Sequence, residues 1–226
     1  AQRVEVEAAE ITWSRSRDGT IQVLRSARDV VEYEAWSEVA IPPDDVWAEA
    51  PDNYGDIIDE RLYGVYTNHD LLPATLAIVD SVTSGADTVY EKAVALRDYL
   101  SSPEFLYTTE IPSLSAQNAV DQFVQTVRVG HCQLYASALA LMLRSEGIPT
   151  RIVSGYRGGE FDPGARSYTV RADMAHVWVE VFFIGYGWVV FDPSPMAAEN
   201  ESMLGALSRQ VSRSILRGKM LWYQSV

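Results

Sequence analysis

Apolar and polar residues alternate along much of the N-terminal part of the chain, which is the pattern of short β-strands. The alternation occurs in three runs, at residues 4–14, 19–26 and 29–42. The sequence RDGT at 17–20, between the first two runs, has the composition of a hairpin turn. A turn-rich, acidic stretch continues up to residue 56. We therefore expect a small β-rich module with its linker over residues 1–55.

Helical spacing of apolar residues takes over after this linker. Pro73 stands at the first position of one helical pattern, and Gly85 follows its end. Thr88 and Glu91 open a second pattern with the spacing of a capping box. A third pattern, which ends at Gly147, is apolar on nearly all sides and predicts a central, buried helix.

Strand-like runs dominate the chain after this third helix. They lie at residues 150–156, 167–172, 175–183 and 187–193. Helices followed by a set of closely connected strands are typical of the α+β class. The apolar pattern therefore predicts an α+β fold.

The last segment, residues 197–226, combines apolar residues at helical intervals with a basic stripe. The apolar positions are Leu204, Leu207, Val211 and Ile215, and the basic positions are Arg209, Arg213 and Arg217. A surface helix with a solvated basic face accounts for this pattern. A membrane-proximal segment is the alternative, because the basic residues precede the sequence MLWY, which suits a membrane interface.

Composition narrows the possible functions. The 226 residues include 18 basic and 31 acidic side chains, and the net charge of −13 argues against a nucleic-acid partner because phosphates would be repelled. No apolar run reaches the roughly eighteen residues that a membrane span requires. A single cysteine excludes an internal disulfide, and the three histidines are not spaced as a ligand cluster, so we expect no metal site.

That single cysteine, Cys132, stands at the first turn of the predicted buried helix. Free backbone N–H groups and the positive end of the helix dipole favour its thiolate there, and the same groups can stabilise an oxyanion. The alternative is a small hydrophobic side chain in the core, which is the common role of a lone cysteine. An available base would favour the catalytic interpretation.

His176 is the histidine best placed to be that base. It opens the strand pattern at 175–183 and lies on the more polar face of this strand. His131 is adjacent to Cys132 in the sequence, but neighbouring side chains on a helix diverge by about 100°. We therefore predict that His176 faces the cysteine.

Asp192 can orient the imidazole of His176 if the hairpin between the last two strands has the right register. A three-residue loop at 183–185 would set His176 opposite Asp192, within hydrogen-bond reach. A loop at 185–187 would set Asp192 opposite Glu180, too far from the histidine. We predict the first register; without the histidine, Asp192 would be interpreted as a turn residue before proline.

Three blocks of the sequence resemble the signature blocks of the transglutaminase-like superfamily. They are GHCQLYASALALMLRSEGIPTRIVSGY, AHVWVEVF and GWVVFDPSP, within residues 130–195. The shared features are a glycine two residues before the cysteine, an R-x-x-G-I-P-x-R turn at 144–151, a histidine–x–tryptophan and a final D-P-S. Gln133 and Leu134 depart from the pattern, which often has a glutamate and an aromatic residue there.

The resemblance implies a papain-like, transglutaminase-like core over residues 56–196. In such a core Cys132 lies at the N-terminus of a helix that packs on an antiparallel sheet carrying His176 and Asp192. These three residues would form a catalytic triad that attacks an amide or peptide carbonyl and forms a thioester, without a metal or an organic cofactor. The candidate residues of the substrate cleft are Trp178, His131 and Gln133. For Trp178 the alternative is a core aromatic side chain that packs under the sheet.

The segments before the cysteine resemble the bacterial membrane-anchored branch of this superfamily. In that branch the domain is an extracytoplasmic insert between transmembrane segments. The resemblance therefore implies that the β-rich start at 1–50 and the basic tail at 205–226 are the flanks of such an insert. It also implies a protein or peptide substrate, and the remainder of a membrane-anchored host protein as a partner.

Three functions are open at this point. Transfer of the acyl group from the thioester to an amine is transglutaminase activity, and transfer to water is cysteine protease or amidase activity. The same triad supports both. The third function is that of an extracytoplasmic binding or scaffold module without turnover. The presence of cysteine, histidine and aspartate together favours catalysis.

Overall fold

The computed structural model describes residues 49–110 and 113–195, together with four short strands closer to the N-terminus. Those strands are β1 (Arg3–Glu5), β2 (Trp13–Arg15), β3 (Ile21–Val23) and β4 (Glu34–Trp36). β1 pairs with β4 and β2 pairs with β3, both in antiparallel orientation. These short strands lie in or at the ends of the three predicted runs. The remainder of those runs, the turn at 17–20 and the helical pattern at 197–226 lie outside the described residues.

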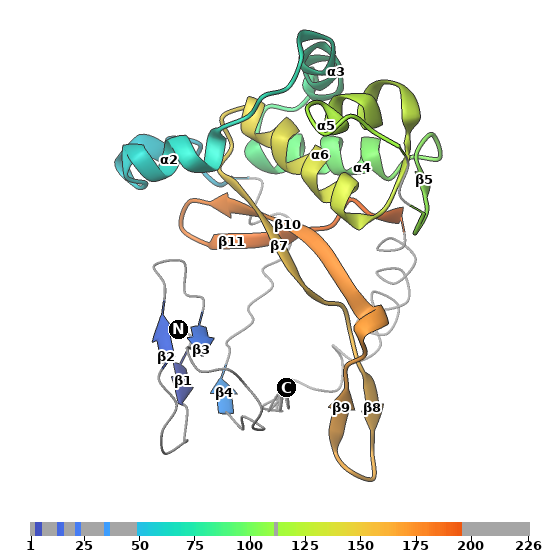
Figure 1. Cartoon of the computed structure of the whole chain (residues 1–226). Helices are drawn as coiled ribbons and strands as arrows, with labels where there is room; N and C mark the ends of the chain where they lie inside the picture. The colour runs from blue at the N-terminus through green and yellow to red at the C-terminus, as the bar shows by residue number, and fades with distance from the viewer. Residues whose placement is uncertain are drawn as a thin grey trace. The chain divides into compact units, whose positions relative to one another are not determined.

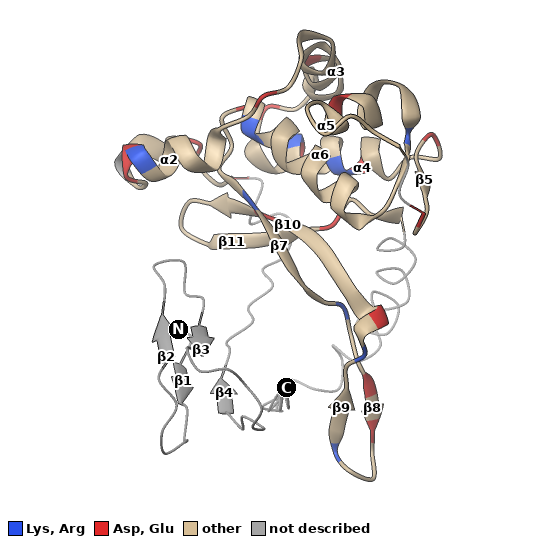
Figure 2. Ribbon diagram, viewed as in Figure 1, with Lys and Arg blue, Asp and Glu red and all other residues tan. Residues whose placement is uncertain are grey.

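The chain divides into two compact units, and the first contains β1 to β4 and a further hairpin. The hairpin consists of β8 (Glu160–Asp162) and β9 (Ser167–Thr169), in antiparallel pairing. Figure 2 shows the acidic character of β8, which has carboxylates at two of its three positions. The sequence pattern indicated β9 but not β8. Strand β8 has one apolar residue between two carboxylates, which is too few to be recognised as a strand.

The second unit contains the helices (Figure 1). They are α2 (Glu60–Thr67), α3 (Pro73–Thr83), α4 (Val89–Leu100), α5 (Ala119–Gln122), which continues into the π-helical turn η2 (Phe123–Val127), and α6 (Cys132–Ser145). Pro73 is the first residue of α3, and Thr88 forms the predicted capping box with Glu91 at the start of α4. The apolar pattern does not indicate α2, because that helix buries none of its residues.

A three-stranded antiparallel sheet lies against these helices (Figure 1). Its strands are β7 (Thr150–Tyr156), β10 (Ala175–Phe183) and β11 (Gly187–Phe191), with β10 in the centre and the short turn η3 (Ala172–Met174) before it. Val179, Val181 and Phe183 on one face of β10 are fully buried in the core, and α6 packs on this strand. The predicted α+β class, with helices packed on an antiparallel sheet, is confirmed.

Helix α6 lies at the centre of the core, as its apolar composition predicts. Its buried residues are Tyr135, Ala136, Ala138, Leu139, Ala140, Met142 and Leu143. The helix ends at Ser145, and Gly147 follows with a φ of 72°, the left-handed conformation that commonly follows a helix end. The first residue of α6 is therefore held in place by the packing of the whole helix.

Candidate active site

His131 accepts the first hydrogen bonds of α6, from the three backbone N–H groups that follow Cys132. His131 is the N-cap residue, and its Nδ1 accepts a hydrogen bond of 3.2 Å from the N–H of Gln133. The carbonyl oxygen of His131 accepts from Leu134 and Tyr135. His131 therefore precedes the helix and fixes its start, so the expected divergence of two helical neighbours does not describe its position.

A short parallel strand pair places Tyr107 beside the start of α6. In this pair β5 (Leu106–Tyr107) lies next to β6 (Val129–Gly130), with Tyr107 opposite Gly130. A Cβ atom on Gly130 would lie 2.7 Å from Cδ1 of Leu134, so only glycine permits this close approach two residues before the cysteine. Packing thus explains why Gly130, which is also a glycine in the family pattern, has no side chain.

The side chain of Tyr107 lies close enough to Cys132 and Asp192 to be influenced by both. Burial raises the pKa of Tyr107 above its ordinary value, and the neighbouring side chains of Cys132 and Asp192 add to this effect. Side chains from β5, from α6 and from the segment after β11 therefore influence one another electrostatically. Sequence reasoning did not single out Tyr107, because a two-residue strand has no periodicity by which to recognise it.

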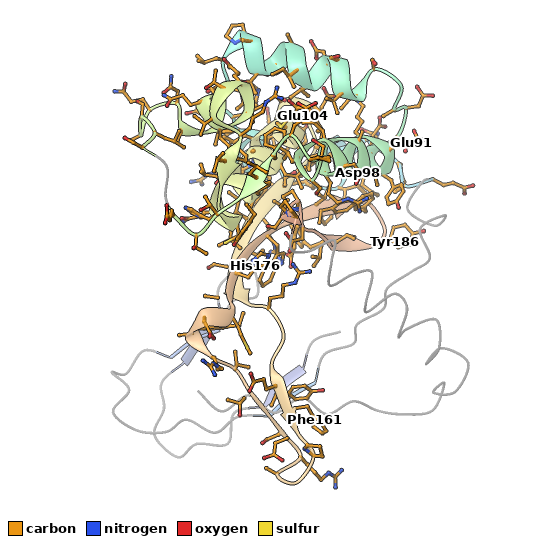
Figure 3. The ribbon with its side chains drawn as sticks, turned by 90° about the vertical axis from the view of Figure 1, so that its right-hand side faces the viewer. Glu91, Asp98, Glu104, Phe161, His176 and Tyr186 are labelled. Carbon is orange, nitrogen blue, oxygen red and sulfur yellow. The ribbon has the colours of Figure 1, made fainter. Side chains whose placement is uncertain are left out.

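His176 and Asp192 form a short hydrogen bond. Nε2 of His176 lies 2.6 Å from Oδ2 of Asp192, and the two side chains are only 10% and 7% exposed. Figure 3 shows His176 on β10, where this strand emerges from beneath the helices. The predicted contact between these two residues is thus present in the structure.

The carboxylate of Asp192 has two further partners. Its Oδ1 accepts a hydrogen bond of 3.0 Å from the backbone N–H of Ser194, and its Oδ2 lies 2.8 Å from Nη1 of Arg157. Burial alone would raise the pKa of this carboxyl, but the hydrogen bonds and charge of His176, together with the hydrogen bonds of Ser194, outweigh burial and hold the pKa below its ordinary value. Asp192 is therefore ionised at neutral pH. Sequence reasoning did not single out Arg157.

The register that brings Asp192 to His176 differs from the predicted one. The loop comprises residues 184–186, not 183–185, since Phe183 pairs with Gly187 and Val179 pairs with Phe191. Continuing this ladder by one residue sets Asp192 opposite Trp178 and not opposite His176. The predicted direct pairing of His176 with Asp192 is therefore wrong. The same predicted register implies that Glu180 pairs with Trp188, which is also wrong because Glu180 lies opposite Val190.

His176 and Asp192 still meet because the observed register differs from the predicted one by two positions along β10. A shift of two residues leaves every side chain on the same face of the sheet, so Asp192 still shares a face with His176. The contact becomes diagonal, which an imidazole and a carboxylate can bridge. Gly185 and Gly187 both have positive φ values, of 88° and 86°, so a glycine in the left-handed region does not by itself identify the loop.

Trp178 packs next to the histidine. Its indole ring is nearly parallel to the imidazole of His176, with a ring-centroid distance of 6.3 Å, and its edge covers Gly155 on β7. The indole Nε1 is buried and has no hydrogen-bond partner among the described residues. Trp178 thus supports the position of the imidazole, and the prediction that it lines the substrate cleft stays a prediction.

The remaining polar residues of this face hold the sheet together. Arg151 forms an ion pair of 2.6 Å with Glu180 on the adjacent strand, and its guanidinium lies 4.4 Å from the ring centroid of Trp188. These contacts give Arg151 and Trp188 structural roles in the sheet. Gln133 is exposed. The prediction that Gln133 and His131 line the substrate cleft stays a prediction.

A model of the family described as the transglutaminase-like superfamily matches residues 76–193, just over half of the chain. The chain belongs to the transglutaminase-like superfamily. The matched region of this transglutaminase-like chain contains Tyr107, Cys132, His176 and Asp192.

Two bacterial proteins are similar to this transglutaminase-like region. The uncharacterized protein YebA of Bacillus subtilis (strain 168) is 41% identical over 127 residues, which are 53% of this chain and 17% of YebA. A protein-glutamine gamma-glutamyltransferase of Pseudomonas aeruginosa is 35% identical over 126 residues, which are 56% of this chain and 19% of that protein. The chain therefore spans about a fifth of the length of these relatives.

The fold is similar to that of the periplasmic domain of TgpA from Pseudomonas aeruginosa. A crystal structure of that domain superposes with a TM-score of 0.58 at 31% sequence identity, covering 67% of this chain and 53% of the other. The chain is thus related to the periplasmic domain of a bacterial protein. Within the part of this chain that the structure describes, no helix has the length and apolar character needed to cross a membrane.

Replacing Gly155 by alanine tests the packing that supports His176. The new Cβ would lie 2.8 Å from Cη2 of Trp178, and overpacking of this kind costs about 1–3 kcal/mol of unfolding free energy. We expect Gly155→Ala to lower the urea midpoint accordingly. Gly64→Ala is the matched control, because no atom lies within 4 Å of its added Cβ, and it should not destabilise. Equal stability of both variants and wild type would contradict the packing described here.

Replacing Asp192 by asparagine tests the ionised carboxylate. Because the pKa of Asp192 is lowered from 3.8, its ionisation stabilises the fold above that pH, and this contribution is lost as the pH falls through the lowered pKa. Asp192→Asn should be less stable than wild type at neutral pH, and the difference should shrink as the pH falls below about 4. Urea unfolding across this range measures it; a difference independent of pH would show that the charge contributes nothing.

Proposed function

We propose that this domain is a thiol-dependent acyltransferase that acts on carboxamide groups of protein or peptide substrates. The observation that supports this most is the 2.6 Å contact between His176 and Asp192 in a transglutaminase-like chain whose single cysteine begins the central helix. Cys132 is the proposed nucleophile, His176 the base and Asp192 its orienting group. The names of the relatives support glutamine as the acyl donor.

The contact with Asp192 selects the tautomer of His176 that a base requires. Because the carboxylate is ionised, Nε2 of the imidazole carries a proton and donates a hydrogen bond to Oδ2. The lone pair is then on Nδ1, and we propose that this atom takes the proton of Cys132. Asp192 would stabilise the resulting imidazolium, in the manner of a triad in which the carboxylate itself does not become protonated.

The proposed reaction has two steps. The thiolate of Cys132 adds to the carboxamide carbon of glutamine, the C–N bond breaks, and ammonia leaves with the proton from His176. A primary amine then adds to the thioester carbon and gives its proton to His176, the C–S bond breaks, and a new amide forms. Water in place of the amine yields a carboxylate, which is the hydrolytic alternative with the same residues.

Two donors next to the sulfur are suited to the oxyanion that forms in both steps. One is the backbone N–H of Cys132, at the positive end of the helix dipole of α6. The other is the hydroxyl of Tyr107, whose side chain lies close to Cys132. We propose that both groups turn to the carbonyl oxygen when substrate binds.

We also propose that the domain is an extracytoplasmic part of a longer, membrane-anchored protein. The similarity to a periplasmic domain and the coverage of 17% to 19% of the curated relatives support this location. The remainder of that host protein is then its covalent partner. On this proposal the substrate is a protein or peptide of the cell envelope.

Alkylation of Cys132 by iodoacetamide tests whether the thiol is activated. An ordinary thiol reacts with an apparent pKa of about 8.5, whereas a thiolate–imidazolium pair reacts rapidly below pH 7. We expect fast alkylation of wild type at pH 6 and slow alkylation of His176→Ala. His69→Ala, which removes a histidine between α2 and α3, is the control and should match wild type. An unactivated thiol in wild type would favour the binding or scaffold module instead.

Hydroxamate formation from a glutamine-containing peptide and hydroxylamine tests acyl transfer itself. Wild type should form the hydroxamate and release ammonia, and Cys132→Ala should lose about 10⁴-fold or more of this rate. Loss of one oxyanion donor in Tyr107→Phe should lower kcat by about 10²–10³-fold with little change in KM. Ammonia release without any hydroxamate would assign hydrolysis, and an unaltered kcat in Tyr107→Phe would remove the tyrosine from the mechanism.

A further inference from the structure

The β7–β10 ladder places Arg157 on the same face of the sheet as His176. It follows the last residue of β7, and its backbone N–H donates a hydrogen bond of 2.8 Å to the carbonyl oxygen of Met174. This bond continues the pairing of His176 with Gly155, so Arg157 lies opposite Met174 and on the same face as the histidine. A loop residue by sequence is therefore held in the register of the sheet.

The guanidinium of Arg157 and the imidazole of His176 share a single carboxylate oxygen. Nη1 of Arg157 lies 2.8 Å from Oδ2 of Asp192, and Nε2 of His176 lies 2.6 Å from the same atom. The other oxygen is occupied by the N–H of Ser194. Donors from β7, from β10 and from the chain after β11 thus hold the carboxylate, which fixes both its position and its plane.

Burial makes this ion pair different from one at the surface. The side chain of Asp192 is 7% exposed and that of Arg157 is 28% exposed, so solvent screens their interaction only in part. A cation bound to the carboxylate weakens the attraction that the carboxylate exerts on an imidazolium at the same oxygen. Arg157 therefore acts on the histidine through Asp192.

We propose that Arg157 is a positioning residue of the active site, which holds Asp192 for His176 and limits how strongly this carboxylate stabilises the imidazolium. This inference rests on the proposed function, because it gives the imidazolium a role in the reaction. Without Arg157, His176 would stay protonated to higher pH, and the thiolate–imidazolium pair would persist to higher pH. Arg157 thus lowers the pH above which the imidazolium of the thiolate–imidazolium pair loses its proton.

The other charged and titratable groups near this cluster are accounted for. Tyr107 and Cys132 approach from β5 and α6, and the charge of Asp192 acts on the same tyrosine. Further along the same face, Arg151 and Glu180 neutralise each other in an ion pair of 2.6 Å. Asp173 lies in η3, next to the residue whose carbonyl accepts from Arg157. Among the ion pairs of the described residues, Asp192 contacts one guanidinium, that of Arg157.

Proton NMR titration of the histidine ring signals tests the proposal without any substrate. The chain has three histidines, so the signal of His176 is assigned by its disappearance in His176→Ala. In Arg157→Gln we expect the pKa of His176 to rise by about one unit, because the carboxylate is no longer shared with a cation. Arg157→Lys, which keeps the charge, should stay within a few tenths of a unit of wild type.

Arg151→Gln is the matched control, since it removes a paired arginine from the same strand and face but not from Asp192. Arg157→Met, which keeps an unbranched stem, is a second neutral variant. An unchanged pKa of His176 in folded Arg157→Gln or Arg157→Met would overturn the proposal. Loss of folding in both would also overturn it, because Arg157 would then be a purely structural strut.

The alkylation experiment separates failure of this proposal from failure of the proposed function. If the wild-type thiol reacts at pH 6 and depends on His176, the triad is assembled, and the NMR titration then judges Arg157 alone. If the thiol is unactivated but the pKa of His176 still rises in Arg157→Gln, the coupling through Asp192 is real and the proposed catalysis is wrong.

Discussion

The packing of α6 on the central strand β10 is the constraint on which the site depends. Val179, Val181 and Phe183 bury one face of β10 in the core, and the buried residues of α6 fill the same core. Moving either element would expose a large apolar area, which costs about 25 cal/mol per Å². Cys132 at the start of the helix and His176 at the start of the strand, the proposed nucleophile and base, are thereby both attached to the buried core of the unit.

The electrostatics of the site centre on one buried carboxylate. Asp192 accepts from Ser194 at one oxygen and contacts both His176 and Arg157 at the other. Partners of this kind are what permit a charge to be buried at all, since an isolated carboxylate in the interior would take up a proton. In the proposed function this carboxylate also selects the tautomer of His176, so the contacts that stabilise the buried charge are the ones on which the proposed chemistry depends.

Membership of the transglutaminase-like superfamily concerns the part of the chain that carries this site. The family match ends at residue 193, one residue after Asp192, and it begins within α3. Similarity to the periplasmic domain of TgpA extends over about two thirds of the chain. The part of the chain that matches the family is therefore the α+β core that holds His176 and Asp192 together.

Local signals in the sequence were sufficient for most elements and for the residues of the candidate triad. Pro73, the capping box at Thr88 and the glycine after α6 act over a few residues, so each predicts a helix boundary directly. The α+β class and the strand at 175–183 follow equally from periodicity. Helix α2 and strand β8 escaped this reasoning, since the helix buries no residue and the strand has one apolar residue in three.

Only the tertiary structure decided how distant segments meet. The hairpin register depends on which glycine closes the loop, and Gly185 and Gly187 are both compatible with a turn, so the predicted direct pairing of His176 with Asp192 was wrong. Tyr107 reaches Cys132 through a parallel strand pair, and Arg157 reaches Asp192 across the central strand. The sequence by itself determined the elements and the identity of the candidate catalytic residues, because those signals are local. The partners that tune these residues are set by packing between segments far apart in the chain, for which the sequence carries no local signal.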